Sequence, residues 1–72
     1  MDTKSMVRQT IPLGVEMSTP MIAARIYGTE KASNQELKNA HHAMSLEVKW
    51  GNARRRTVKV NGRSVTLWVR LQ

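Results

Sequence analysis

The pair Asn61-Gly62 limits what this chain can fold into more than any other part of its sequence. The pair lies between two β-rich runs, residues 57–60 and 64–71, in which apolar and polar residues alternate. A type I′ turn needs positive φ at both central positions, and Asn followed by Gly tolerates this best. We therefore predict a β-hairpin with a two-residue turn. Its register pairs Val60 with Arg63, Val58 with Val65, Arg56 with Leu67, and Arg55 with Trp68.

The predicted hairpin has two faces of different character, because successive side chains of a strand point to opposite sides. The first face is apolar, and we expect it to be the core face; it carries Val58, Val60, Val65, Leu67, Val69 and Leu71. The second face is basic and polar; it carries Arg55, Thr57, Lys59, Ser64, Thr66, Trp68 and Arg70. We expect this second face to meet solvent or a partner.

Residues 46–50 also alternate, which is typical of a strand. A three-residue loop, residues 51–53, places the apolar residues of this segment on the core face of the hairpin. A two-residue loop would place them on the basic face, because a shift of one residue turns every side chain over. We therefore predict that residues 46–50 form a third strand and not the end of a helix.

Two short helices are predicted before these strands. Thr19 suits the N-cap and Pro20 the first turn of one helix, and Gly28 suits its left-handed end. Ser33 and Glu36 have the spacing of a capping box for a second helix that ends near residue 45. The apolar face of this second helix carries Leu37, Ala40, His41 and Met44.

The N-terminal part of the chain has the weakest pattern. Residues 1–6 are expected to be frayed. In residues 7–13, Val7, Ile11 and Leu13 alternate with polar residues and proline, which indicates a short strand. Pro12 cannot donate a hydrogen bond, so such a strand is expected at the edge of a sheet.

Together these elements predict an α+β fold, in which two short helices are followed by an antiparallel β-hairpin or a three-stranded meander. A chain of 72 residues makes a single domain, residues 1–72. The sequence has no cysteine, which excludes disulfides and thiolate metal sites and favours a reducing compartment. No apolar stretch approaches the roughly 18 to 20 residues that span a bilayer, so we expect a cytoplasmic protein.

The positive charge of the chain is concentrated at its C-terminal end. The whole sequence has 12 Lys and Arg against 5 Asp and Glu, a net charge of +7. Residues 1–48 carry five bases and five acids, whereas residues 49–72 carry seven bases and no acid. Solubility alone does not require the bases to be gathered in this way. A neutral framework with one basic end is typical of a protein that binds an anionic partner.

The candidate binding residues of the C-terminal third are Lys49, Arg54, Arg55, Lys59, Arg63, Trp68 and Arg70. Arg and Lys side chains neutralise phosphates, while hydroxyl groups set the position of the protein on the nucleic-acid backbone. Two interpretations of Trp68 stay open. It either has a binding role, in which it stacks on a base or sugar or holds Arg55 by a cation–π contact, or it packs under a terminus or a helix without meeting a ligand.

The second helix offers a weaker candidate surface. Gln35, Lys38 and Asn39 lie on its outward side and are residue types that can reach base edges in a major groove. No metal or other cofactor is expected. His41 and His42 are neighbours in a helix, so they point about 100° apart and cannot chelate one ion. Catalysis is not expected either, because the acids are not paired and no nucleophile arrangement is present.

The order of an edge strand, a helix, a capped helix and a basic hairpin resembles winged helix-turn-helix DNA-binding proteins. The residues that carry the resemblance are 19–28, 33–45 and the wing-like hairpin 54–70. Two features differ from that pattern, namely the longer link at residues 29–32 and the lack of a predicted helix before the pair. The resemblance implies double-stranded DNA as the partner, bound by a homodimer or a cooperative multimer.

Proteins of this outline in phages and plasmids act in transcription regulation, as excisionases or as architectural factors. Function does not follow from fold alone, however. Two other interpretations of the basic surface therefore remain. One is an RNA-binding module that uses the sheet, and the other is a non-enzymatic inhibitor that binds an acidic surface of a host protein.

Overall fold

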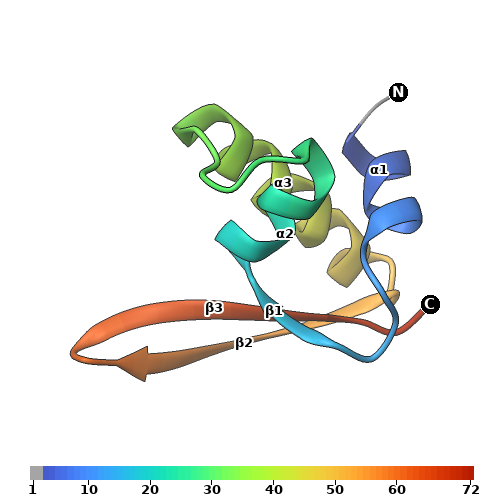
Figure 1. The fold of residues 1–72 in the computed structure, drawn as a ribbon. Helices are drawn as coiled ribbons and strands as arrows, with labels where there is room; N and C mark the ends of the chain where they lie inside the picture. Colours follow the sequence, from blue (N-terminus) through green and yellow to red (C-terminus); the bar gives the residue numbers. More distant parts are fainter. Residues whose placement is uncertain (1–2) are drawn as a thin grey trace.

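The computed structural model describes residues 3–72, in which three helices lie on one side of a three-stranded antiparallel sheet (Figure 1). The elements are α1 (Thr3–Thr10), β1 (Glu16–Ser18), α2 (Thr19–Tyr27), α3 (Asn34–Lys49), β2 (Ala53–Val60) and β3 (Arg63–Arg70). Within the sheet β3 is central, with β1 and β2 paired to its two sides. The predicted α+β class is confirmed. None of the helices within residues 3–72 has the length and apolar composition that a membrane span requires.

The predicted hairpin is confirmed, including its register. All four predicted pairs between β2 and β3 are present, from Val60 with Arg63 at the turn to Arg55 with Trp68. Asn61 has φ of 53° and Gly62 has φ of 79°, so both central residues of the turn are left-handed, as a type I′ turn requires. The hairpin tip extends beyond the helices (Figure 1).

This turn is expected to be sensitive to substitution at Gly62. A valine there is strained at φ of 79°, because a β-branched side chain resists the left-handed region. We expect Gly62→Val to reduce the free energy of unfolding by about 1 to 3 kcal/mol, the usual cost of such a conformation. Thermal melts followed by circular dichroism measure this loss. An unchanged melting temperature would contradict the turn geometry, and Gly62→Asn, which tolerates positive φ, serves as the mild control.

The two predicted helix starts are present, with one difference. α3 begins with the predicted capping box, in which Ser33 Oγ accepts from the Glu36 N–H at 3.2 Å and Glu36 Oε1 accepts from the Ser33 N–H at 2.9 Å. α2 ends at Gly28 in the left-handed conformation, also as predicted. Its N-cap, however, is Ser18 and not Thr19, so the prediction for Thr19 was wrong.

The prediction of a strand at residues 46–50 was wrong, because α3 continues to Lys49. Its core-facing stripe continues from Ala40 and Met44 to Glu47, which is 1% exposed. The Glu47 carboxylate is held by two side chains: Arg8 Nε donates to it at 3.3 Å and Asn52 Nδ2 at 2.9 Å. Because its carboxylate is hydrogen-bonded, this acid can occupy a core position. A charged residue at that position hides the helical spacing of the core residues in the sequence.

The predictions for the N-terminal part were also wrong. Residues 3–10 form helix α1 instead of a frayed end and a strand, while residues 1–2 lie outside the described part of the chain. Val7 and Ile11 are buried, and the Ile11 N–H donates to the Val7 carbonyl at 3.0 Å, which closes one helical turn. The third strand of the sheet is β1, at residues 16–18, and it pairs with β3.

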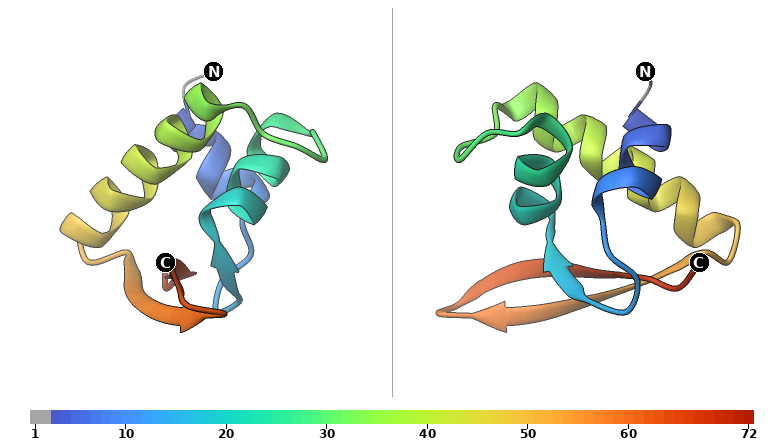
Figure 2. Two further views of the ribbon diagram at one scale, coloured as in Figure 1. Left: turned by 90° about the vertical axis from the view of Figure 1, so that its left-hand side faces the viewer. Right: turned by 45° about the vertical axis from the view of Figure 1, so that its right-hand side comes forward.

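The two faces of the hairpin are inverted with respect to the prediction. We call the face that meets the helices the inner face; it carries Ala53, Arg55, Thr57, Lys59, Ser64, Thr66, Trp68 and Arg70. The outer face carries Arg54, Arg56, Val58, Val60, Arg63, Val65, Leu67 and Val69. Trp68 and Ala53 are buried, whereas the predicted core residue Val60 is 49% exposed. The views of Figure 2 likewise show the described helices on the inner side alone.

Candidate nucleic-acid interface

Trp68 joins the hairpin to the helices and is a core residue, 1% exposed. Its indole Nε1–H donates to Thr19 Oγ1 of α2 at 2.8 Å. The His41 ring of α3 meets it edge-on, with ring centroids 5.2 Å apart and planes at 82°. These contacts leave no face of the indole for a base, so the interpretation of Trp68 as a stacking residue was wrong and the packing interpretation holds.

The guanidinium of Arg55 lies over the Trp68 ring, 5.5 Å from its centroid. This is the predicted cation–π contact, and it holds the guanidinium on the inner face while the side chain stays exposed. His41 is also exposed. Arg55 of β2 and His41 of α3 both contact the same indole and are both exposed, so they mark the place where the surface of α3 meets that of the hairpin. The shared surface runs from α3 to the hairpin.

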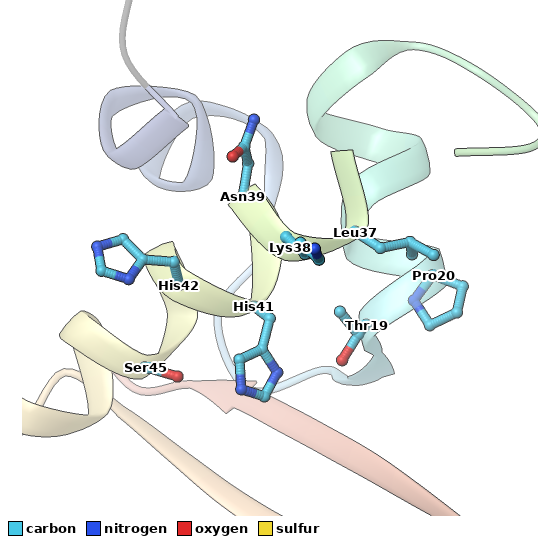
Figure 3. Close-up of a pocket in the computed structure, with 8 residues that line it drawn as sticks. All are labelled: Thr19, Pro20, Leu37, Lys38, Asn39, His41, His42 and Ser45. Carbon is cyan, nitrogen blue, oxygen red and sulfur yellow. The ribbon is translucent and has the colours of Figure 1, made fainter. Parts of the chain in front are cut away.

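A shallow hollow continues this surface along α3 (Figure 3). It is lined by Thr19 and Pro20 of α2 and by Leu37, Lys38, Asn39, His41, His42 and Ser45 of α3. Figure 3 shows the His41 ring pointing from α3 toward the sheet, across from Thr19. Lys38 and His42 are exposed. The hollow therefore offers nitrogen and hydroxyl groups to a partner that lies along α3.

The candidate residues of α3 lie on or beside this hollow. Lys38 and Asn39 line it, and the Gln35 amide Nε2–H donates to Asn39 Oδ1 at 3.0 Å, so these two amides form one exposed pair. The sequence interpretation missed His41, which it assigned to the apolar face of the helix. A helical wheel centred on Ala40, Met44 and the unexpected Glu47 would have placed His41 at the edge of that stripe.

The remaining candidates of the C-terminal third are dispersed. Lys59 is exposed on the inner face, and Arg63 is exposed beside the hairpin tip. Arg54 is exposed on the outer face, which is turned away from α3. Lys49 ends α3 near the start of β2, at the end of the hairpin far from its tip (Figure 1). The structure therefore brings Arg55 and Lys59, but not Lys49 or Arg54, to the surface shared with α3.

Arg70 has a structural role. Its Nη1 donates to the carbonyl oxygens of Arg8 at 3.1 Å and Ile11 at 2.8 Å, and its Nε donates to the Gln72 carbonyl at 2.8 Å. The two Nη1 bonds join the end of α1 to the last strand, and the Nε bond holds the C-terminal segment. A contact between Arg70 and a ligand stays a prediction.

Three of the five carboxylates are bonded to other groups of the chain. Glu36 caps α3, and Glu47 is buried with Arg8. Glu16 of β1 accepts two hydrogen bonds from Arg56, both at 2.7 Å, and this hydrogen-bonded guanidinium lowers the pKa of Glu16 below its ordinary value. The pair is therefore charge-neutral at pH 7, which removes Arg56 from the free bases of the hairpin.

The described residues contain no group of three or more His, Cys, Asp or Glu side chains placed to hold a metal ion. No family model matches the chain. No curated protein matches it, and no solved structure does.

Proposed function

We propose that this protein binds double-stranded DNA, with the exposed side of α3 facing a groove and the inner face of the hairpin following the phosphate backbone. The observation that carries the proposal is the surface around Trp68, where His41 of α3 and Arg55 of the hairpin both contact the indole. Its exposed bases are Lys38, Arg55 and Lys59, while Arg63 is exposed beside the tip on the outer face. A surface with bases and no carboxylate among its described residues suits a phosphate backbone.

The shape of the surface favours duplex DNA over a flat anionic partner. The hairpin tip projects beyond the helices, and α3 lies to the side of it, so two separate elements can reach neighbouring parts of a duplex (Figure 2). The order of elements, a helix and short strand before two helices and a hairpin, agrees with the resemblance to winged helix-turn-helix proteins. A non-enzymatic role in the cytoplasm, in transcription regulation or as an excisionase or architectural factor, belongs to the same proposal.

The salt dependence of binding tests this function. Three exposed bases that each contact a phosphate predict that the logarithm of the association constant falls against the logarithm of salt concentration with a slope of about −3. Fluorescence anisotropy with a labelled duplex of random sequence, between low and near-physiological salt, measures the slope. A slope near zero, or no binding at low salt, would contradict the proposal.

The same titration separates the two other partners. Duplex RNA has a narrow major groove that does not admit a helix, so binding through α3 should be weaker on RNA than on DNA of the same sequence. Poly-glutamate supplies the negative charge without a groove and represents an acidic protein surface. If the protein bound duplex RNA or poly-glutamate as tightly as DNA, or more tightly, DNA would no longer be the favoured partner.

A further inference from the structure

The outer face of the sheet is apolar at a place where a sheet of this kind usually has polar residues. The described helices all lie on the opposite, inner side (Figures 1 and 2). When an antiparallel sheet packs on a core with one face, the other face is commonly solvated and polar. The outer face instead carries the aliphatic residues Val58, Val60, Val65, Leu67 and Val69. Contiguous apolar patches on a protein surface commonly mark a contact with another molecule.

A hollow of about 290 Å³ lies on this face, at the end of the hairpin far from its tip. We call it the outer-face hollow. Its lining includes three aliphatic and three charged residues, namely Leu67, Val69, Leu71, Glu16, Arg54 and Arg56. Leu67 and Val69 are half-buried, and Leu71 is 42% exposed. The hollow therefore offers aliphatic surface to a ligand next to charged groups.

The charges of the outer-face hollow do not balance, because its one carboxylate is already engaged. Both carboxylate oxygens of Glu16 accept hydrogen bonds from Arg56 at 2.7 Å, and this pair reaches across β3 from β2 to β1. Arg54 is exposed, and within residues 3–72 it has no ion pair. A guanidinium presents its donors in a planar fork that matches a carboxylate. The hollow thus lacks a carboxylate that a partner could supply.

We propose that the outer-face hollow binds an acidic segment of another protein, which places a large apolar side chain in the hollow and a neighbouring carboxylate on Arg54. Small-molecule sites have volumes of about 300 to 1,000 Å³ and enclose most of their ligand. The outer-face hollow is below this range, and its rim is open at Arg54 and Leu71. A protein segment can fill it and also cover the apolar surface beside it, at Val58 and Val65.

Two other anionic partners suit the outer-face hollow less well. A nucleic-acid backbone gains little from aliphatic surface, and of the two arginines that line the hollow, Arg56 is already paired. An anionic membrane surface is usually bound through a cluster of bases together with aromatic or other large apolar anchors. The outer face of the hairpin carries no aromatic residue. One unpaired guanidinium beside an aliphatic hollow matches a protein segment with a carboxylate next to an apolar side chain.

Titration of the full chain with a synthetic peptide, followed by NMR of the backbone amides, tests this site. The probe is a peptide of about eight residues in which one Trp stands between Glu residues, and we expect a dissociation constant of about 10 to 500 µM. The amide signals of Leu67, Val69 and Leu71 should shift most. Replacing the Trp of the probe by Ser, or its Glu residues by Gln, should weaken binding about tenfold or more.

Three results of this titration would overturn the proposal. One is the absence of binding at about 1 mM probe. Another is equal binding of the probes with Trp and with Ser, because the attraction would then come from charge alone. The third is a set of shifts centred on α3 or on the inner face of the hairpin. No DNA is present, so each of these results would leave the proposed DNA binding untouched.

Matched variants place the contact in the outer-face hollow. Arg54→Gln/Leu71→Ala removes one exposed base and one exposed apolar side chain from the hollow, and should raise the dissociation constant of the probe about tenfold or more. Arg25→Gln/Met21→Ala makes corresponding changes at exposed positions of α2, on the other side of the sheet, and should stay within about twofold of wild type. Thermal melts check that both variants stay folded. Equal effects of the two variants would overturn the assignment to the hollow.

Vesicles of phosphatidylcholine and phosphatidylserine provide the membrane arm of the experiment. If the chain bound these vesicles but not the probe peptide, and Arg54→Gln/Leu71→Ala abolished the vesicle binding, the hollow would belong to a lipid surface and the proposal would be overturned. The same variant should keep its affinity for duplex DNA within about threefold of wild type, because the outer face is turned away from the proposed DNA interface.

Discussion

Replacing Trp68 with alanine is expected to lower the free energy of unfolding by about 3 to 5 kcal/mol, the usual cost of truncating a buried aromatic side chain. Trp68 is 1% exposed and connects α2, α3 and β2 through Thr19, His41 and Arg55. A domain of this size is stabilised by only about 4 to 11 kcal/mol, at 0.05 to 0.15 kcal/mol per residue. Trp68→Ala should therefore remove a large part of the stability, measured by urea unfolding with circular dichroism.

Two control variants separate the stability lost with the packing of Trp68 from the stability lost when any tryptophan is removed. Trp50→Ala makes the same chemical change at the end of α3, where the side chain is 46% exposed, and should cost well under half as much. Trp68→Phe keeps most of the buried area but removes the hydrogen bond to Thr19 Oγ1, and should cost an intermediate amount. If Trp68→Ala proved no more destabilising than Trp50→Ala, the burial of the indole would be wrong, and Trp68 would return as a candidate for stacking on a base.

Local features of the sequence predicted the local structure well. The turn at Asn61-Gly62, the register of the hairpin, the capping box at Ser33 and the end of α2 at Gly28 all depend on residues that are near one another in the chain. Turn geometry and helix capping are determined by such short-range contacts. They are therefore accessible without knowledge of the tertiary structure.

The errors arose where a distant contact decides the structure. Glu47 looks like a solvent-facing residue of a strand, and only Arg8, 39 residues earlier, and the nearby Asn52 make it a core residue of α3. The spacing of Val7 and Ile11 fits a helix as well as a strand, and their packing against the other helices selects the helix. A pattern of seven residues contains too few periods to separate the two structures.

The inversion of the hairpin faces has a different cause. Six Val and Leu residues lie on one face, and six bases or hydroxyls surround one tryptophan on the other, so the pattern alone favours burial of the aliphatic face. In the structure the face with Trp68 is buried instead of the aliphatic row. Trp68 fills the space beneath α2 and α3 and donates its N–H to Thr19. The aliphatic row is left outside. The register was predicted from the turn, but the side on which the helices dock was not.

The two faces of β2 provide the sharpest test of the DNA interface. Arg55→Gln/Lys59→Gln removes two bases from the inner face, and Arg54→Gln/Arg56→Gln removes two from the outer face of the same strand. Each phosphate contact contributes about 0.9 log unit to the association constant for every tenfold fall in salt below 1 M, about 0.7 at 0.15 M. The inner pair should therefore weaken binding to duplex DNA about 30-fold at 0.15 M salt. It should also make the salt slope less negative by about 2 units.

The outer pair should weaken binding by less than about threefold, because its side chains point away from the duplex and a charge beyond about 8 Å is screened at this salt concentration. Both variants lose two positive charges from exposed positions, so a difference between them reports the face and not the net charge. Fluorescence anisotropy with a labelled duplex measures both variants. If the two pairs weakened binding equally, the attraction would come from overall charge. If the outer pair weakened it more, the outer face would become the DNA-binding surface.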